Sequence, residues 1–176
     1  MPTSELKDRF QTLVDDHKKI LFKICNSYCR SADDREDLAQ EIIVQLWRSF
    51  PSFDQRARFS TWMYRVALNV AISFVRREQT RTRHVLSDDE RVLEAIDERE
   101  APSADLQRLH ALIDQLAPLN KALVLLYLDG NTAQDIADVL GITATNVTTK
   151  LGRLKQTLAR GFAPTIPDPG ANDGSR

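Results

Sequence analysis

Residues 35–77 read REDLAQEIIVQLWRSFPSFDQRARFSTWMYRVALNVAISFVRR and contain two amphipathic helical patterns joined by a short loop. Proline disfavours helical backbone in the residue before it, so Pro51 closes the first pattern at Phe50. Ser60 is the expected N-cap of the second pattern. Apolar residues recur at helical spacing in both patterns, which predicts a buried stripe on each helix. The stripes are Leu38, Ile42, Ile43, Leu46, Trp47 and Phe50 in the first helix, and Phe59, Met63, Val66, Ala67, Val70 and Phe74 in the second.

Each of these two helices also carries side chains that its buried stripe does not require. On the first helix they are mostly polar: Asp37, Gln40, Glu41, Val44 and Arg48. On the second helix they are Trp62, Arg65, Asn69, Ser73 and Arg76. Tryptophan, arginine and asparagine along one stripe favour a surface that contacts a partner over one that only faces water.

The charge near the second helix indicates what that partner is. Between Asp54 and Arg83 every basic residue is an arginine, and only Asp54 and Glu78 are acidic. Arginine suits bidentate contact with phosphate and stacking on bases. Aromatic residues are interleaved with the arginines, and together they are typical of a single-stranded nucleic-acid site. The arginines are Arg56, Arg58, Arg65, Arg76, Arg77, Arg81 and Arg83, and the aromatics are Phe53, Phe59, Trp62 and Tyr64. Phe53 and Phe59 are equally explained as core residues, whereas the position of Trp62 beside Arg65 favours a functional role.

The whole chain has 176 residues, enough for one or two small domains. No apolar run approaches the roughly 20 residues of a membrane span, and the N-terminus MPTSELKDRF lacks the regions of a signal peptide, so we expect a cytoplasmic protein without membrane insertion. The formal net charge of −1 conceals an acidic segment at residues 88–105 between basic flanks. Cys25 and Cys29 lack a second ligand pair, so reduced, buried thiols are expected, with no metal and no cofactor.

The periodicity along the chain predicts an all-α protein with two small helical domains. The first domain spans residues 1–83 and begins with a helical region, 4–30, that has a possible break near Asp15-Asp16-His17. An acidic, flexible linker follows over residues 84–102. The second domain spans residues 103–162, and the proline- and glycine-rich tail 163–176 is expected to be disordered.

The second domain contains the proportions of a helix-turn-helix between Thr132 and Arg160. Thr132 and Asp135 have the spacing of a capping box, Gly141 supplies a tight turn, and Thr143 caps the last helix. The exposed start of that helix has small hydroxyl and amide side chains suited to base edges and phosphates: Thr143, Ala144, Thr145, Asn146, Thr148 and Thr149. The cations that follow, for attraction to the DNA backbone, are Lys150, Arg153, Lys155 and Arg160. Helical hairpins also occur as inert packing units, which is the alternative for this segment.

Two segments resemble extracytoplasmic-function sigma factors of bacterial RNA polymerase. DREDLAQEIIVQLWRSF with FSTWMYRVALNVAISFVRR is similar to their second conserved region, and LIDQLAPLNKALVLLYLDGNTAQDIADVLGITATNVTTKLGRLKQTL is similar to their fourth. The two segments occur in the family's order and spacing. The resemblance implies a promoter-specificity subunit without catalytic activity, whose partners are core polymerase, promoter DNA in duplex and single-stranded form, and an anti-sigma factor.

The resemblance also implies roles for individual positions. The first helix would bind the polymerase clamp helices through Asp37, Gln40, Glu41, Val44, Trp47 and Arg48. The −10 promoter element would be recognised and opened by Arg56, Arg58, Phe59, Ser60, Thr61, Trp62, Arg65, Asn69, Arg76 and Arg77. The −35 element would be contacted by the last helix, over residues 143–153, while its domain docks on the polymerase flap. Gly152 and Gln156 make this helix less basic than is usual in the family.

Two other functions are compatible with parts of the chain. A helix-turn-helix regulator with an N-terminal sensor or dimerisation domain explains Thr132–Arg160 but not the arginine and aromatic stripe at Arg56–Arg77; copurification with core polymerase would separate the two hypotheses. An enzyme is disfavoured because His17, His84 and His110 have no accompanying nucleophile or ligand cluster.

Overall fold

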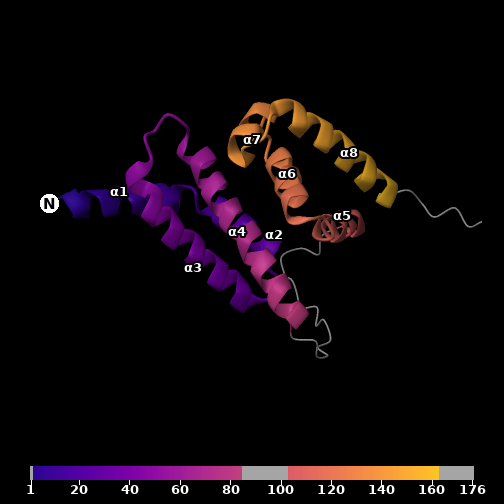
Figure 1. Ribbon diagram of the computed structural model, residues 1–176, viewed down its shortest axis with the longest axis horizontal. Helices are drawn as coiled ribbons and strands as arrows, with labels where there is room; N and C mark the ends of the chain where they lie inside the picture. The colour runs from indigo at the N-terminus through magenta and orange to yellow at the C-terminus, as the bar shows by residue number, and fades with distance from the viewer. Residues whose placement is uncertain (1, 85–102, 163–176) are drawn as a thin grey trace, which may run out of the picture.

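The computed structural model describes residues 2–84 and 103–162, and these form helices joined by turns (Figure 1). The all-α prediction is therefore confirmed. The predicted acidic linker lies outside the described residues except for His84, which ends a helix, and the predicted tail 163–176 lies outside them entirely. Among the described residues, no helix combines the length and apolar character needed to cross a bilayer.

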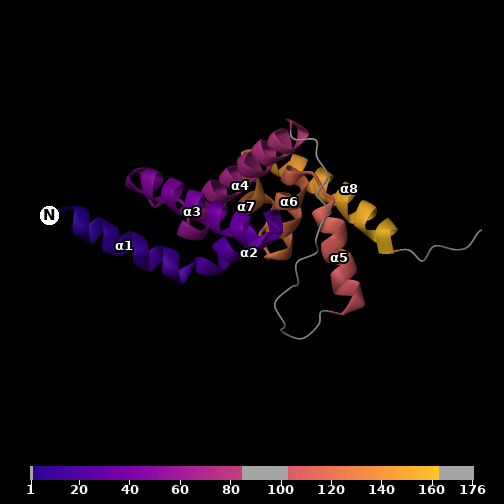
Figure 2. The ribbon, with the colours of Figure 1, turned by 90° about the horizontal axis from the view of Figure 1, so that it is seen from below.

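The N-terminal unit comprises α1 (Pro2–Asp16), α2 (Lys18–Tyr28), α3 (Ala32–Ser49) and α4 (Phe59–His84). α2, α3 and α4 pack against one another, and α1 extends away from this bundle beyond the break predicted near His17 (Figure 2). The most deeply buried side chains come from the three packed helices: Ile24, Leu38, Ile42, Leu46, Met63 and Leu68. A 3₁₀ turn, η1 (Phe50–Ser52), follows α3 where Pro51 was expected to close it.

The buried stripe predicted for α3 is too wide. Ile43 and Trp47 are 38% and 37% exposed, whereas Leu38, Ile42 and Leu46 are fully buried. Each of the two wrongly assigned residues follows a buried one, and one residue of an α-helix turns by about 100°. That rotation carries Ile43 and Trp47 to the edge of the core, where Trp47 still contacts the ring of Phe10.

The helix predicted to start after Ser60 begins one position earlier. α4 includes Phe59 and Ser60, so Ser60 lies within its first turn and is not the residue before the helix. The α4 core is also broader than the predicted stripe, because Tyr64, Leu68, Ala71 and Ile72 are buried while Val66 and Val70 are half-buried. α4 has this wide buried surface because α2, α3, α6 and α7 all pack against it.

The C-terminal unit comprises α5 (Ala104–Asp114), α6 (Pro118–Leu128), α7 (Ala133–Leu140) and α8 (Ala144–Phe162). Its core includes Leu123, Leu126, Ile136 and Val147. Both halves of the predicted Thr132–Asp135 capping box are present, with N···O distances of 3.0 and 3.1 Å. Gly141 adopts a left-handed backbone with φ 68°, a conformation that glycine adopts without the steric cost of a Cβ atom, and so turns the chain from α7 toward α8.

Candidate nucleic-acid interface

An aromatic cluster occupies the connection between α3 and α4. The ring of Trp62 lies 5.0 Å from that of Phe53 and 5.3 Å from that of Phe59, measured between centroids. Phe50 is buried beneath them, 5.2 Å from Phe10 of α1. Phe53 and Trp62 are half-buried, so they belong to the cluster and also reach its surface. Such rings, held by their neighbours and open on one side, can accept a stacked base.

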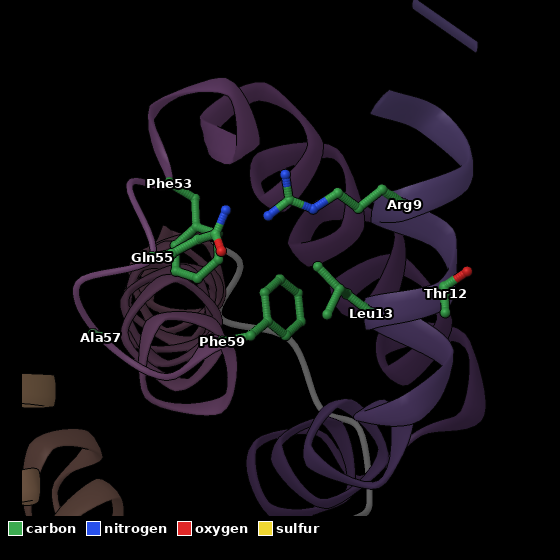
Figure 3. Close-up of a pocket in the computed structure, with 7 residues that line it drawn as sticks. All are labelled: Arg9, Thr12, Leu13, Phe53, Gln55, Ala57 and Phe59. Carbon is green, nitrogen blue, oxygen red and sulfur yellow. The ribbon is translucent and has the colours of Figure 1, made fainter. Parts of the chain in front are cut away.

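A cavity of about 460 Å³ opens beside this cluster, between α1 and the loop that precedes α4 (Figure 3). Phe53 and Phe59 line it from the loop side, and Arg9 and Leu13 line it from α1. Gln55, at its rim, has a left-handed backbone with φ 61°, which is uncommon for a residue with a side chain. Strained loop positions of this kind are concentrated at binding sites. The lining combines apolar rings with guanidinium and amide groups, which matches the chemistry of a nucleobase.

Exposed arginines flank the cavity and continue along α4. Arg58, Arg65 and Arg76 are exposed, as is Asn69 on the same side of α4 as Trp62. Arg56 is paired with Asp54 at 3.1 Å within the loop. Phe59 is buried, and Ser60 and Thr61 are half-buried, so these three predicted DNA contacts are less accessible than the arginines.

The predicted polymerase-binding side chains gather on the outer side of α3. Asp37, Gln40, Arg48 and Val44 are exposed, and Val44 is the most exposed large apolar residue of this helix at 47%. Glu41 forms an ion pair with Arg77 of α4 at 2.6 Å. The structure thus joins a residue expected to bind polymerase to one expected to bind DNA. This ion pair raises the pKa of Arg77 above its ordinary value.

The start of α8 is exposed as the sequence predicts. Thr143 caps the helix by accepting a hydrogen bond from the Asn146 backbone at 3.2 Å. Thr145, Asn146, Thr148, Thr149 and Arg153 are exposed, whereas Ala144 and Lys150 are half-buried. The hydroxyls of Thr148 and Thr149 donate to carbonyls of their own helix at 3.0 Å and keep free lone pairs for a ligand.

Some features of the site have no clear signal in the sequence. Arg9, Thr12 and Leu13 line the cavity although they lie about 40 residues before the loop along the chain. Lys155, expected to attract DNA phosphates, instead lies over the ring of Tyr127 at 4.0 Å and donates to its hydroxyl at 2.9 Å. Apolar residues recur in α1 at Leu6, Phe10 and Leu13, which predicts a buried face for this helix but not its position beside the loop.

The two cysteines are buried in the N-terminal unit, as expected. Burial raises the pKa of Cys25 to about 11 and is the largest cause that raises the pKa of Cys29 to about 12. The thiols are therefore protonated at neutral pH, a form that binds metals poorly. Within the part of the chain that the structure describes, no three histidine, cysteine or carboxylate side chains gather around a common point.

Comparison with known proteins identifies both units. The family model "Sigma-70 region 2" matches residues 13–81, and the model "Sigma-70, region 4" matches residues 106–158. The sigma factor SigW of Bacillus subtilis, of the extracytoplasmic-function class, is 25% identical over 169 residues, covering 88% of this chain and 89% of its own. The sigma-E factor of Haemophilus influenzae, of the same class, is 26% identical over 175 residues, covering 91% and 90%. The chain belongs to the extracytoplasmic-function sigma factors. It is a non-catalytic subunit that directs RNA polymerase in transcription initiation.

Solved structures share the fold of this sigma factor. CnrH in complex with the cytosolic domain of CnrY is 22% identical, with a TM-score of 0.63 and coverage of 88% of this chain and 87% of CnrH. The sigma factor RpoE of Bartonella quintana, in complex with the anti-sigma factor NepR, is 20% identical, with a TM-score of 0.65 and coverage of 89% and 96%.

Proposed function

We propose that three surfaces of this sigma factor divide the work of initiation. The outer side of α3 binds the polymerase clamp helices, the loop before α4 and α4 itself recognise and open the −10 element, and the start of α8 reads the −35 element while the C-terminal unit docks on the flap. The observation that carries this proposal is the open cavity beside the aromatic cluster, flanked by exposed arginines.

The energetics of strand opening explain why such a cavity is needed. A protein without an ATP-driven motor opens DNA only by binding the single strand better than the duplex. Unpairing and unstacking one base costs a few kcal/mol, and stacking on an aromatic ring returns about 1–3 kcal/mol per base. One base held against Phe53 or Trp62, with phosphates held by Arg58, Arg65 and Arg76, is enough to favour the opened strand over the duplex in A·T-rich DNA.

The remaining partners follow from the relatives. CnrH is seen in complex with the cytosolic domain of CnrY, and RpoE is seen in complex with the anti-sigma factor NepR. We therefore expect an anti-sigma factor for this chain, and a cytoplasmic location. The acidic residues at 88–100 lie outside the described residues. We expect them to enter the basic channel of the polymerase by mimicking nucleic-acid charge. Replacing them with Ser and Asn at constant length tests this, because unchanged initiation and core affinity would leave only a tether.

The test of the −10 assignment uses holoenzyme on two templates, a duplex promoter and the same promoter with a pre-opened bubble. Trp62→Ala and Asn69→Ala should lower open-complex formation on the duplex, and the bubble should restore at least part of it. Trp62→Phe is the matched control, because it keeps an aromatic ring and should retain most of the duplex activity. Equal losses on both templates, together with a lowered melting temperature, would assign Trp62 to the core and overturn its role in opening.

A further inference from the structure

The helix α1 closes one side of the cavity beside the aromatic cluster, and its packing fixes where it lies. The ring of Phe10 on α1 lies 5.1 Å from that of Trp47 and 5.2 Å from that of Phe50, measured between centroids. The ring of His17, the residue after α1, lies 5.2 Å from that of Phe59. Contacts at two points along the chain therefore hold α1 beside the loop, and they fix the α1 side of the cavity.

Arg9 is the charged side chain that reaches this cavity from α1. Figure 3 shows its guanidinium group extending from α1 into the space between α1 and the loop. The guanidinium carbon lies 5.9 Å from the centroid of the Phe50 ring, a cation–π contact that leaves the N–H donors available. Among the described residues, no carboxylate pairs with Arg9 and no hydrogen bond engages its guanidinium group. These donors are therefore available to a ligand in the cavity.

The loop side of the cavity offers an amide group and not a second cation. Asp54 accepts a hydrogen bond from the backbone of Arg56 at 3.1 Å and pairs with its guanidinium group at 3.1 Å, so Arg56 is already engaged within the loop. Gln55 lies between these two residues, and its side chain lines the cavity (Figure 3). Among the described residues that line the cavity, Arg9 is the one charged side chain.

The hydrogen-bonding pattern of these groups favours particular bases. A guanidinium group presents parallel N–H donors and no acceptor, so it pairs best with two neighbouring acceptors. Guanine offers such a pair in O6 and N7, and cytosine offers one in O2 and N3. Thymine separates its two carbonyls by an N–H group, and adenine places its amino group beside both N1 and N7. Gln55 adds a donor and an acceptor, and can complete the hydrogen bonds to either favoured base.

We propose that Arg9 reads the identity of the base extruded from the −10 element, and that it favours guanine or cytosine over adenine or thymine at one position. The proposal rests on the assignment of −10 opening to the loop and α4 made above, and it adds a specificity-determining residue from another helix. Arg9 precedes residues 13–81, the part of the chain that matches the region 2 family model. This part of the cavity wall therefore comes from outside the segment shared with that model. One such base is compatible with an otherwise A·T-rich element, because the bidentate pair offsets part of the cost of unpairing it.

The first test maps base preference with holoenzyme made from the full chain. The templates are promoters with a pre-opened −10 region, so the cost of opening does not enter, and each position of each strand is changed in turn to the other bases. At one position the wild type should bind guanine or cytosine about 5- to 100-fold better than adenine or thymine, the discrimination expected of one bidentate contact. Arg9→Gln should shift the preference at that position to adenine, because glutamine pairs with the neighbouring donor and acceptor of adenine.

Base analogues identify which of the two favoured bases is bound. The analogue 7-deazaguanine lacks the N7 acceptor, and 3-deazacytosine lacks the N3 acceptor. The analogue of the bound base should abolish the preference of the wild type, and it should leave the affinity of Arg9→Gln unchanged. If neither analogue lowered the affinity of the wild type, Arg9 would not be reading neighbouring acceptors and the proposal would fail.

Two further variants separate base reading from general attraction. Arg9→Lys keeps the charge but not the planar fork, so it should lose most of the discrimination while keeping the salt dependence of binding. Lys7→Gln is the matched control for charge. Lys7 is exposed on α1, lies about 200° around the helix from Arg9 and does not line the cavity, so its variant should keep the wild-type preference. All of these variants should melt at the wild-type temperature, because both side chains are exposed.

The proposal would be overturned if Arg9→Gln kept the wild-type preference. Equal weakening for all four bases, with a smaller salt slope, would also overturn it, because Arg9 would then be a phosphate contact. A failure of the −10 assignment itself would look different: no base change in the opened region would alter the affinity of the wild type.

Discussion

In the N-terminal unit some of the residues expected to hold DNA are also part of the core or pack against it, whereas in the C-terminal unit the residues expected to read DNA are exposed. Phe59 is buried, and Trp62 packs against Phe53 and Phe59 beside the cavity. By contrast, Thr145, Asn146 and Thr149 are exposed on α8, and the Thr149 hydroxyl bonds only to its own helix. The difference follows from the two tasks. A base taken out of the duplex needs a rigid, partly apolar receptacle, whereas base edges in the major groove are read by an exposed helix.

This comparison predicts that stability and binding are coupled in one unit and separate in the other. Phe50→Ala removes a ring that contacts Phe10, Phe53, Phe59 and Trp62, and should cost about 3–5 kcal/mol of unfolding free energy. Thr149→Ala on α8 should change it by less than about 0.5 kcal/mol. Urea unfolding measures both: Trp47 and Trp62 report on the N-terminal unit by fluorescence, and circular dichroism reports on all helices. A cost below about 1 kcal/mol for Phe50→Ala would show that the cluster is not a structural support for the cavity.

The second prediction separates sequence reading from general attraction within α8. Asn146→Ala should lower discrimination at one −35 position by about 1–3 kcal/mol, because a base-edge contact is lost. Arg153→Ala should weaken binding to all sequences and reduce the slope of log affinity against log salt by about 1, because a phosphate contact is lost. Thr157→Ala, about one turn beyond Arg153 on the exposed side of α8, should do neither. Holoenzyme binding to −35 variants over a range of salt concentrations gives both quantities, and the opposite pattern would mean that the two roles are reversed.

The third prediction concerns the pH dependence of stability in the N-terminal unit, which contains both cysteines of the chain. A thiol whose pKa is raised by folding binds its proton more tightly in the folded state. The stability it contributes is complete below the pKa of an unfolded cysteine, about 8.5, and is lost as the pH rises toward 11 and 12 for Cys25 and Cys29. Between pH 8 and pH 10 the fluorescence-detected melting temperature should therefore fall more steeply for the wild type than for Cys25→Ala/Cys29→Ala. Equal slopes would show that the thiols ionise as readily in the folded state as in the unfolded one.

Local rules were sufficient to predict the helices and most of their caps, although Ser60, the expected N-cap of α4, lies inside that helix. Helical periodicity predicted the helices, and the Thr132–Asp135 box, the Gly141 turn and the Thr143 cap are all present as predicted. These features depend on neighbours within a few residues, so the sequence carries the information directly. Helical periodicity wrongly predicted Ile43 and Trp47 as buried, because a pattern of apolar residues does not show how much of the helix surface the neighbouring elements cover.

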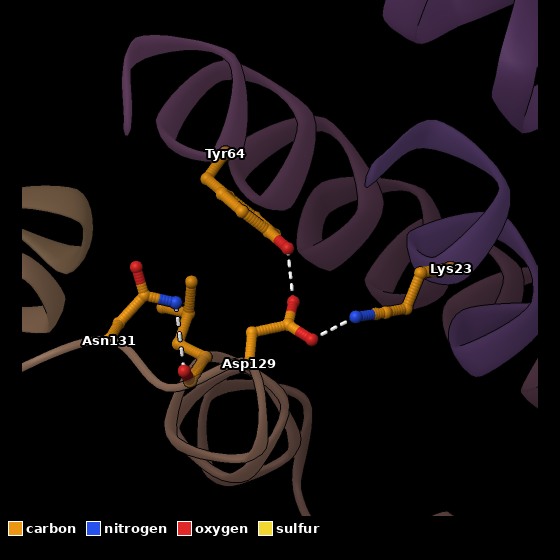
Figure 4. A network of polar contacts seen from close by, with 5 residues as sticks. Lys23, Tyr64, Asp129 and Asn131 are labelled. Carbon is orange, nitrogen blue, oxygen red and sulfur yellow. Dashed lines mark hydrogen bonds and ion pairs between the residues drawn. The ribbon is translucent and has the colours of Figure 1, made fainter. Parts of the chain in front are cut away.

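Contacts between residues that lie far apart in the chain could not be predicted from the sequence. Asp129 contacts Lys23 and Tyr64 (Figure 4), which lie 106 and 65 positions away along the chain, and no local pattern in the sequence pairs them. α1 likewise contributes Arg9 and Leu13 to the cavity through packing alone. The candidate DNA contacts were predictable as a set because arginine and aromatic residues are concentrated near α4. Their division into a buried ring such as Phe59 and exposed groups such as Arg65 required the packed structure.

The smallest predicted effect concerns the contact between the expected polymerase surface and the expected DNA surface of the N-terminal unit. It tests whether stability and binding, which we expect to be coupled in this unit, can be separated at that contact. Glu41 and Arg77 form an exposed ion pair, and such pairs add little to stability, so Glu41→Gln and Arg77→Gln should both leave the melting temperature unchanged.

The effects of Glu41→Gln and Arg77→Gln on binding should have opposite signs. Glu41→Gln should weaken core binding about two- to fivefold while freeing Arg77 for phosphate, so the isolated −10 strand binds slightly better. Arg77→Gln should weaken strand binding and leave core binding unchanged or improved. Val44→Ala is the reference for the polymerase surface, because it removes an exposed apolar contact without changing charge. If Glu41→Gln and Arg77→Gln both weakened strand binding, the intact pair rather than the free arginine would be what the strand recognises.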